Sequence, residues 1–200
     1  QPQQVWDAYT SDWYAMDAAY RHVCTAYLRA RSVECDVLEE PARAVVDWAE
    51  NLYSNWFLAD ANACWTSAAQ GEWADCGYIE GPERQDEFYW HVLPTFVGSA
   101  KTTIVIVSDA LRYEVGRDVA TLLERERGGN VKVSSMQAVF PSITEVGMPA
   151  LMPHQALKLA ADGSFVLADG MPTATTPQRE AVLTHVEPTA RALRSSTYLN

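Results

Sequence analysis

The stretch that most constrains the fold of this chain is an apolar run that ends in an acid. Residues 103–108 hold five β-branched side chains among six, and Asp109 follows directly. Such a run is typical of a strand that is buried on both faces of a parallel sheet, so we predict a strand here. Ligands of open α/β sheets bind at the carboxyl ends of the strands, so Asp109 is a candidate metal ligand or catalytic carboxylate. An Asp that caps the following helix fits the same junction.

The residues after Asp109 predict a helix, a second strand and a return to the same sheet edge. Apolar side chains recur at three- and four-residue steps over 111–123, and residues 131–140 have the pattern of a strand. A right-handed crossover would then bring Ser142 and Thr144 beside Asp109. A hydroxyl is a poor nucleophile unless a base or a metal ion lowers its pKa. This combination therefore indicates metal-assisted phosphoryl or sulfuryl transfer.

A short helix is predicted directly after these hydroxyls, over residues 145–153. Thr144 would lie at or near its N-terminus, where free amide donors and the helix dipole favour a bound anion. That position suits a nucleophile that handles phosphate. A Ser142 or Thr144 that only caps the helix is the alternative that the residues alone leave open.

This stretch holds three motifs: Ser108-Asp109-Ala110-Leu111-Arg112-Tyr113-Glu114, Pro141-Ser142-Ile143-Thr144-Glu145-Val146-Gly147-Met148 and Leu151-Met152-Pro153-His154. Together they resemble the PglZ family. That family belongs to the alkaline phosphatase superfamily and occurs in phage-defence systems of the Pgl and BREX type. Shorter upstream pieces also resemble PglZ-like sequences, so the similarity extends over most of the chain. The upstream pieces are Tyr20-Arg21, residues 53–56 and Phe88-Tyr89.

The resemblance implies a metal-dependent active site. In the superfamily, the acid that ends the first strand binds a divalent ion, and a Ser or Thr at a helix start is both nucleophile and ligand of a second metal. By that similarity Asp109 is a metal ligand and Thr144 is the nucleophile and a metal ligand, with Ser142 as the reserve nucleophile. Two zinc ions are expected in the intact protein. Arg112, one turn from Asp109, could bind the phosphate or pair with a neighbouring acid.

The ligand set implied by the family is incomplete in this chain. The family places further ligands downstream of the nucleophile, one set in an Asp-His pair. After Thr144 the chain offers only His154, Asp162, Asp169 and His185 as candidates, and none of them forms such a pair. We therefore expect the chain to be a central piece of a longer protein, inactive by itself, with the missing ligands beyond residue 200.

The charge distribution suggests two domains. Residues 1–100 hold 16 acids and 5 arginines, whereas residues 101–200 hold 10 acids and 10 bases, so the net charge of −11 arises in the first half. All seven tryptophans also lie there. We predict an α/β protein with a helical module over 1–98 and, over 99–200, the first part of an alkaline-phosphatase-like parallel sheet with flanking helices. An acidic module is a poor groove for nucleic acid, because it repels phosphate backbones.

Helical periodicity is strongest near the N-terminus. Large side chains recur at three- and four-residue steps, which predicts a buried stripe on a helix from about Val5 to Arg29. A second amphipathic helix is predicted from Pro41, and a last one over residues 177–194. The Asp162-Gly163 pair between short alternating runs predicts a hairpin. The stripe consists of Trp6, Tyr9, Trp13, Met16, Tyr20, Val23 and Tyr27.

We expect a cytoplasmic location by default, since the chain shows neither a signal-like start nor a membrane-spanning run. No apolar run approaches the length of a membrane span, so no membrane contact is expected. The cysteines lack Cys-x-x-Cys spacing, which favours reduced structural thiols over a zinc site or disulfides. They are Cys24, Cys35, Cys64 and Cys76.

Two functional hypotheses follow. In the first, the chain is part of a PglZ-like phosphohydrolase, a phosphatase or a phosphodiesterase or nuclease, with a metal-activated Thr144 and a phosphoester or nucleic-acid substrate. In the second, the protein is a non-catalytic scaffold that assembles with other phage-defence proteins through the acidic helical module. A chance match of an unrelated α/β domain is a more distant third.

Overall fold

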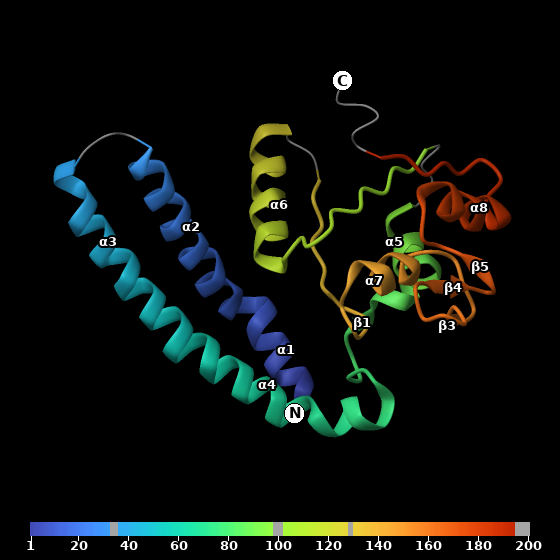
Figure 1. Cartoon of the computed structure of the whole chain (residues 1–200), viewed down its shortest axis with the longest axis horizontal. Coiled ribbons are helices and arrows are strands. Elements are labelled where there is room, and N and C mark those ends of the chain that lie inside the picture. Colours follow the sequence, from blue (N-terminus) through green and yellow to red (C-terminus); the bar gives the residue numbers. More distant parts are fainter. Residues whose placement is uncertain (33–35, 98–101, 128–129, 195–200) are drawn as a thin grey trace. The chain divides into compact units, whose positions relative to one another are not determined.

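The structure is a computed structural model that describes residues 1–32, 36–97, 102–127 and 130–194 (Figure 1). The chain divides into two compact units, each built from two separate segments. Unit 1 contains Gln1–Gly81 and Ala110–Ser135, and unit 2 contains Pro82–Asp109 and the chain from Met136 onward. The boundary predicted between residues 98 and 99 lies outside the described residues and stays a prediction.

Unit 1 begins with a continuous helical run that matches the predicted N-terminal helix. It consists of α1 (Pro2–Ala8), the π-helical turn η1 (Tyr9–Trp13) and α2 (Tyr14–Arg31). Every residue of the aromatic stripe is half-buried, so the stripe packs against other helices as predicted but its burial is incomplete. The physical reason is that few helices cover it: Trp6 packs against Trp65, and Tyr20 stacks on Tyr53.

The second helical run of unit 1 comprises α3 (Asp36–Asn51), the π-helical turn η2 (Leu52–Leu58) and α4 (Ala59–Cys76). It ends at Gly77, whose φ of +77° is a left-handed C-cap that glycine adopts without strain. The prediction that this helix starts at Pro41 is wrong. The helix begins at Asp36, and the proline lies inside it at the cost of one backbone hydrogen bond.

Helix α6 (Tyr113–Arg127) completes unit 1 and packs against α2. The guanidinium of Arg21 on α2 pairs with the carboxylate of Asp118, and Glu114 at the start of α6 is completely buried. The helix predicted after Asp109 therefore forms. Its packing partner is the N-terminal helical run, since both belong to unit 1.

Unit 2 contains a short parallel ladder and a small antiparallel sheet. Strand β1 (Glu83–Arg84) pairs in parallel with β2 (Met136–Gln137). Strands β3 (Leu157–Leu159), β4 (Val166–Ala168) and β5 (Met171–Pro172) pair in that order. The turn between β3 and β4 holds Gly163 at φ +72°, as the predicted hairpin requires. The helices of this unit are η3 (Gln85–Glu87), η4 (Phe88–Val92), α5 (Leu93–Val97), α7 (Thr144–Ala150) and α8 (Thr176–Val186).

The core of unit 2 lies where α8 packs on the antiparallel sheet. Met152, Ala168 and Val182 are its buried centre. The half-buried side chains of Leu157 and Leu183 pack around them. This small core fixes the loop after α7 against β4 and α8. The last helix ends at Val186, short of the predicted residue 194, because the chain turns to an extended backbone at Glu187.

The predicted first strand does not form. Within the described residues, 102–108 join no strand ladder, and Ile104 and Ile106 are 81% and 86% exposed. The expectation of a strand buried on both faces is therefore wrong for this chain. A strand needs a hydrogen-bonded neighbour, and of the predicted strand over 131–140 only Met136–Gln137 is paired. The fold class is nevertheless α/β as predicted: a helical N-terminal region, then a short parallel sheet with helices.

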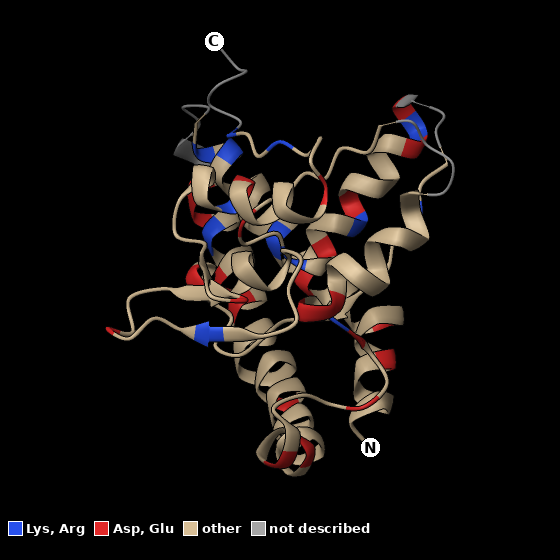
Figure 2. Ribbon diagram, turned by 90° about the vertical axis from the view of Figure 1, so that its right-hand side faces the viewer, with Lys and Arg blue, Asp and Glu red and all other residues tan. Residues whose placement is uncertain are grey.

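The helices of unit 1 carry many of the acids, which Figure 2 marks on the ribbon. None of the helices in the described ranges combines the length and the apolarity that a membrane crossing needs.

Candidate functional site

Asp109 and Thr144 meet in unit 2. Thr144 is the first residue of α7, and the extended backbone of Ile143 leads into the helix. The Thr144 hydroxyl donates a hydrogen bond of 2.8 Å to Oδ2 of Asp109. Both side chains are exposed. The sequence predicted that these two groups lie close together, and they do; their catalytic roles stay predictions.

The two candidate nucleophiles differ in their surroundings. Thr144 contacts the Asp109 carboxylate, whereas Ser142 lies in the exposed loop that precedes α7. A hydroxyl that donates its proton to a carboxylate keeps its oxygen lone pairs available to an electrophile. Of the two residues, Thr144 is the one whose hydroxyl is held by a carboxylate.

Arg112 reaches a neighbouring acid. It lies in unit 1, and its Nη2 is 2.8 Å from Oε1 of the fully buried Glu114. Burial opposes the charged guanidinium, but the ion pair with Glu114, together with nearby Tyr53 and Asp17, outweighs it and raises the pKa of Arg112. Of the two roles that the sequence left open, the structure records the ion pair. Phosphate binding by Arg112 stays a prediction.

A buried cluster of acids and tyrosines beside this pair escaped sequence analysis. Asp17 on α2 is 7% exposed and accepts hydrogen bonds from the hydroxyls of Tyr9 and Tyr53, the latter at 2.8 Å. Burial, together with the adjacent Asp17 carboxylate, raises the pKa of Tyr9 above its ordinary value. The available signal was an acid placed among the aromatic residues of the N-terminal stripe.

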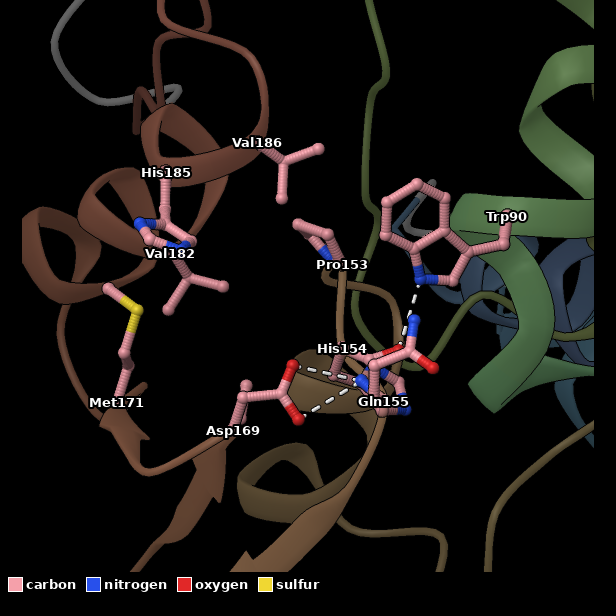
Figure 3. A pocket seen from close by; sticks show the side chains of 10 residues that line it. Trp90, Pro153, His154, Gln155, Asp169, Met171, Val182, His185 and Val186 are labelled. Carbon is pink, nitrogen blue, oxygen red and sulfur yellow. Dashed lines mark hydrogen bonds between the residues drawn. The ribbon is translucent and has the colours of Figure 1, made fainter.

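A cavity of about 250 Å³ in unit 2 gathers three of the four ligand candidates downstream of Thr144 (Figure 3). His154, Asp169 and His185 line it, together with Trp90 from η4. Asp162 instead lies in the β3–β4 turn, where its carboxylate accepts hydrogen bonds from Ser164.

Backbone hydrogen bonds hold the polar side chains of this cavity in place. The Asp169 carboxylate accepts the backbone N–H groups of Gln155 and Ala156, and these bonds lower its pKa. Nδ1 of His154 lies 2.7 Å from the carbonyl oxygen of Met152. Because a carbonyl oxygen only accepts hydrogen bonds, Nδ1 carries the hydrogen in this contact. In a neutral ring Nε2 is then the acceptor nitrogen. The Trp90 indole N–H donates to the carbonyl of His154 at 3.0 Å, as Figure 3 shows.

These groups do not assemble a metal centre by themselves. Across the ranges 1–32, 36–97, 102–127 and 130–194, no three His, Cys, Asp or Glu side chains are arranged to hold a metal ion. Asp109 and Thr144 are two oxygen donors at one place. They are part of a ligand set at most, since a catalytic zinc site takes about three protein ligands.

Comparison with known proteins agrees with the motif resemblance. Residues 88–198 match the family described as "BREX system PglZ alkaline phosphatase-like domain". The chain is 33% identical over 171 residues to "Alkaline phosphatase-like protein PglZ" of Bacillus cereus (strain H3081.97). This alignment covers 84% of the chain and 19% of the relative. It is 34% identical over 182 residues to "Alkaline phosphatase-like protein BrxZ" of Escherichia coli O9:H4 (strain HS). That alignment covers 89% of the chain and 21% of the relative.

The chain thus spans about a fifth of the length of these curated relatives. No solved structure matches it. The family match covers more than half of the chain and includes both Asp109 and Thr144. The chain therefore belongs to the PglZ family of alkaline phosphatase-like proteins of BREX systems.

Proposed function

We propose that this chain carries part of the active site of a metal-dependent phosphohydrolase, with Thr144 as the nucleophile. One observation carries the proposal: the hydroxyl of Thr144 donates a 2.8 Å hydrogen bond to the Asp109 carboxylate. Both side chains are exposed, so a phosphoester can approach them. The substrate is a phosphomonoester or a nucleic-acid phosphodiester.

The chain's own residues prepare the attack on phosphorus. Asp109 accepts the hydroxyl hydrogen bond and thereby orients the Thr144 oxygen. The oxygen forms a bond to phosphorus while its proton passes to Oδ2 of Asp109. The bond from phosphorus to the leaving oxygen breaks, and that oxygen departs with the electron pair. Arg112, three residues after Asp109, is the proposed phosphate contact, a role that competes with its ion pair to Glu114.

The donor chemistry fits a divalent metal, and we propose zinc. Carboxylate oxygen is a common zinc ligand, and a hydroxyl joins it here at hydrogen-bond distance. A bound ion would lower the pKa of the Thr144 hydroxyl and stabilise the negative charge that develops on the phosphoryl oxygens. Two ions need more ligands than these two residues offer. The relatives are about five times as long as the region that matches this chain. The remaining metal ligands would come from other segments of such a longer protein.

The proposal is tested with matched variants of the intact protein. Turnover of a chromogenic phosphodiester with added zinc should fall by at least about a hundredfold in Thr144→Ala and in Asp109→Asn. Thr144→Ser should retain part of the activity because it keeps the hydroxyl. Thr121→Ala and Asp60→Asn, which remove the same groups at exposed positions elsewhere, should have no effect.

The 200-residue chain supplies a second test. Calorimetry should show weak zinc binding and assays should show little or no turnover, because the two donors do not complete a site. Tight binding and clear turnover that Asp109→Ala abolishes would instead place ligands among His154, Asp162, Asp169 and His185. Turnover by the intact protein that survives both active-site substitutions would contradict the nucleophile. Absence of turnover would favour the alternative function, assembly with other BREX proteins.

A further inference from the structure

The side-chain amide of Gln85 joins two segments on either side of the loop that leads to Thr144. Its Oε1 accepts the backbone N–H of Val139 at 3.1 Å, and its Nε2 donates to the backbone carbonyl of Gly147 at 3.1 Å. Val139 precedes the loop, and Gly147 lies in α7 about one turn after Thr144. All four residues belong to unit 2. We call the Gln85 amide with these two hydrogen bonds the Gln85 clip.

The Val139 end of the clip takes the place of a missing strand. The last rung of the parallel ladder pairs Arg84 with Gln137, because the chain leaves β1 for the short helix η3 at Gln85. The N–H of Val139 lies beyond that rung, and the side-chain oxygen of Gln85 accepts it instead of a backbone carbonyl. Val139 is half-buried, and an N–H withdrawn from water without an acceptor is costly. This bond therefore helps to fix the start of the loop.

The Gly147 end of the clip satisfies a carbonyl near the end of α7. In a regular helix the N–H of Leu151 would bond to the Gly147 carbonyl, but it bonds to the carbonyl of Met148 at 3.3 Å. Gln85 supplies a donor to the Gly147 carbonyl. A Cβ at residue 147 would lie 3.2 Å from Nε2 of Gln85, so the lack of a side chain there allows this close approach. The clip thus depends on the glutamine and on the glycine.

Burial of side chains does little to hold the loop between the two ends of the clip. Phe140 and Ile143 are 72% and 51% exposed, and Pro141 and Ser142 are exposed as well. The N–H of Ile143 bonds to the carbonyl of Pro141 at 2.9 Å, which shapes the turn from within. The clip, by contrast, attaches both ends of the loop to the start of η3.

We propose that Gln85 is a positioning residue for the Thr144 nucleophile. Its bonds to Val139 and Gly147 fix the first turn of α7, and thereby the place of the Thr144 hydroxyl beside Asp109. A displacement of about 1 Å at a reacting atom can cost about a hundredfold in rate. The positioning role rests on the proposed phosphohydrolase function, whereas the clip itself can be tested without turnover.

Hydrogen exchange of the 200-residue chain tests the clip. Gln85→Met keeps the length of the side chain but removes both hydrogen bonds. The N–H of Val139 should then exchange about tenfold faster, while the amides of α8 keep their protection. Gln85→Glu keeps an acceptor for Val139 but places a carboxylate oxygen against the Gly147 carbonyl. It should therefore preserve the protection of Val139 and reduce that of α7.

Kinetics of the intact protein test the positioning role. Well below the thermal midpoint, Gln85→Met should lower kcat for the chromogenic phosphodiester by about tenfold and change KM by less than about twofold. The reason is that it displaces the nucleophile and removes no substrate contact. Thr173→Val is the matched control. It removes a buried hydroxyl that donates to the carbonyl of Val166 in the same unit, so it should lower the thermal midpoint and leave kcat unchanged.

Gly147→Ala separates positioning from stability. Alanine is a better helix former than glycine, which offsets the weakened bond, so the thermal midpoint should stay close to that of the wild type. The new methyl group presses on the Gln85 amide, and kcat should fall by about threefold or more. In the Gln85→Met background the same substitution should change kcat by less than about twofold, because the bond that it disturbs is already absent.

The results distinguish the clip from the proposed function. Unchanged exchange of Val139 in Gln85→Met would show that the clip does not hold the loop. A wild-type kcat in Gln85→Met, together with loss of turnover in Thr144→Ala, would overturn the positioning role, and so would an equal loss of kcat in Thr173→Val. Turnover that survives Thr144→Ala would overturn the nucleophile and the positioning role together, while the exchange of Val139 would still decide whether the clip forms.

Discussion

Arg112 is the residue with two competing explanations, because the motif associates it with phosphate and the structure pairs it with Glu114. Glu114 is fully buried, and its charge is balanced by Arg112 at 2.8 Å and, more distantly, by Arg21 at 3.8 Å. A buried carboxylate that loses its cation is costly. The ion pair thus gives Arg112 a role in stability that is separable from any role in catalysis.

A double-mutant cycle measures that role. Arg112→Met should lower the free energy of unfolding by about 2 kcal/mol, because it leaves the Glu114 carboxylate under-compensated. Adding Glu114→Met should recover part of the loss, with a coupling of about 1 kcal/mol or more in urea unfolding. Arg125→Met, on the exposed side of α6, should cost less than about 0.5 kcal/mol. A zero coupling would leave Arg112 available for phosphate.

The contacts of the site were only partly predictable from the sequence. The closeness of Asp109 and Thr144 was predicted from a strand-helix-strand pattern, and the contact is present. Of that pattern, however, only the helix and one short strand form, so local periodicity does not explain the contact. Glu114, by contrast, pairs with Arg21, which lies on a helix far upstream in the sequence. No local pattern specifies which distant helix covers a given acid. The gathering of His154, Asp169 and His185 around one cavity was unpredictable for the same reason.

At the scale of elements, charged contacts join α2 to α6. Asp118 on α6 accepts hydrogen bonds from Arg21 and from His22, the latter at 2.9 Å. The hydrogen bond from the Arg21 guanidinium is the main reason why the pKa of Asp118 lies below its ordinary value. A carboxyl group with a depressed pKa stabilises the folded state above its unfolded-state pKa. That contribution is lost as the pH falls through its folded-state value.

The pH dependence of this contact can be measured with Asp118→Asn. At pH 6 the variant should be less stable than the wild type by about 0.5–1 kcal/mol, as expected of a partly exposed pair. The difference should shrink below about pH 4 and vanish once Asp118 is protonated in both states. Glu124→Gln, on an exposed site of the same helix, is the matched control for urea unfolding. A difference that stays constant with pH would rule out the ion pair as its source.

The elements themselves were predicted with uneven success, and pairing explains why. Helices stabilise their own backbone, so the N-terminal run, α6 and α7 appear near their predicted positions. Strands depend on neighbours, which periodicity does not identify. Strands β3 and β4 are close in sequence and pair with each other, so the turn signal between them was enough to predict the hairpin. The run over 103–107 has a strand's composition, but among the described residues it has no ladder partner.

At the scale of the whole molecule, we expect the exposed apolar run over 103–107 to promote aggregation of the 200-residue chain. Ile104 and Ile106 expose most of their surface in a β-branched segment that is free of charge. Such segments pair readily with other chains. Ile106→Lys should therefore reduce concentration-dependent light scattering while changing the free energy of unfolding by less than about 0.5 kcal/mol.

Leu159→Lys is the matched control for this substitution. It places the same charge at another exposed apolar residue, 67% exposed on β3, but outside the β-branched run. It should reduce scattering less than Ile106→Lys does. A large drop in the thermal midpoint of Ile106→Lys would show that Ile106 is buried in solution and would contradict the structure.

The way in which the two units share the chain constrains where the protein can be divided. The polypeptide passes from one unit to the other after Gly81, after Asp109 and after Ser135. Residues 1–98 therefore contain the two long helical runs of unit 1 but not α6, the helix that pairs with Arg21. Unit 1 is complete only when residues 110–135 are present as well, and unit 2 needs residues from both sides of that segment. A truncation after residue 98 would therefore leave both units incomplete.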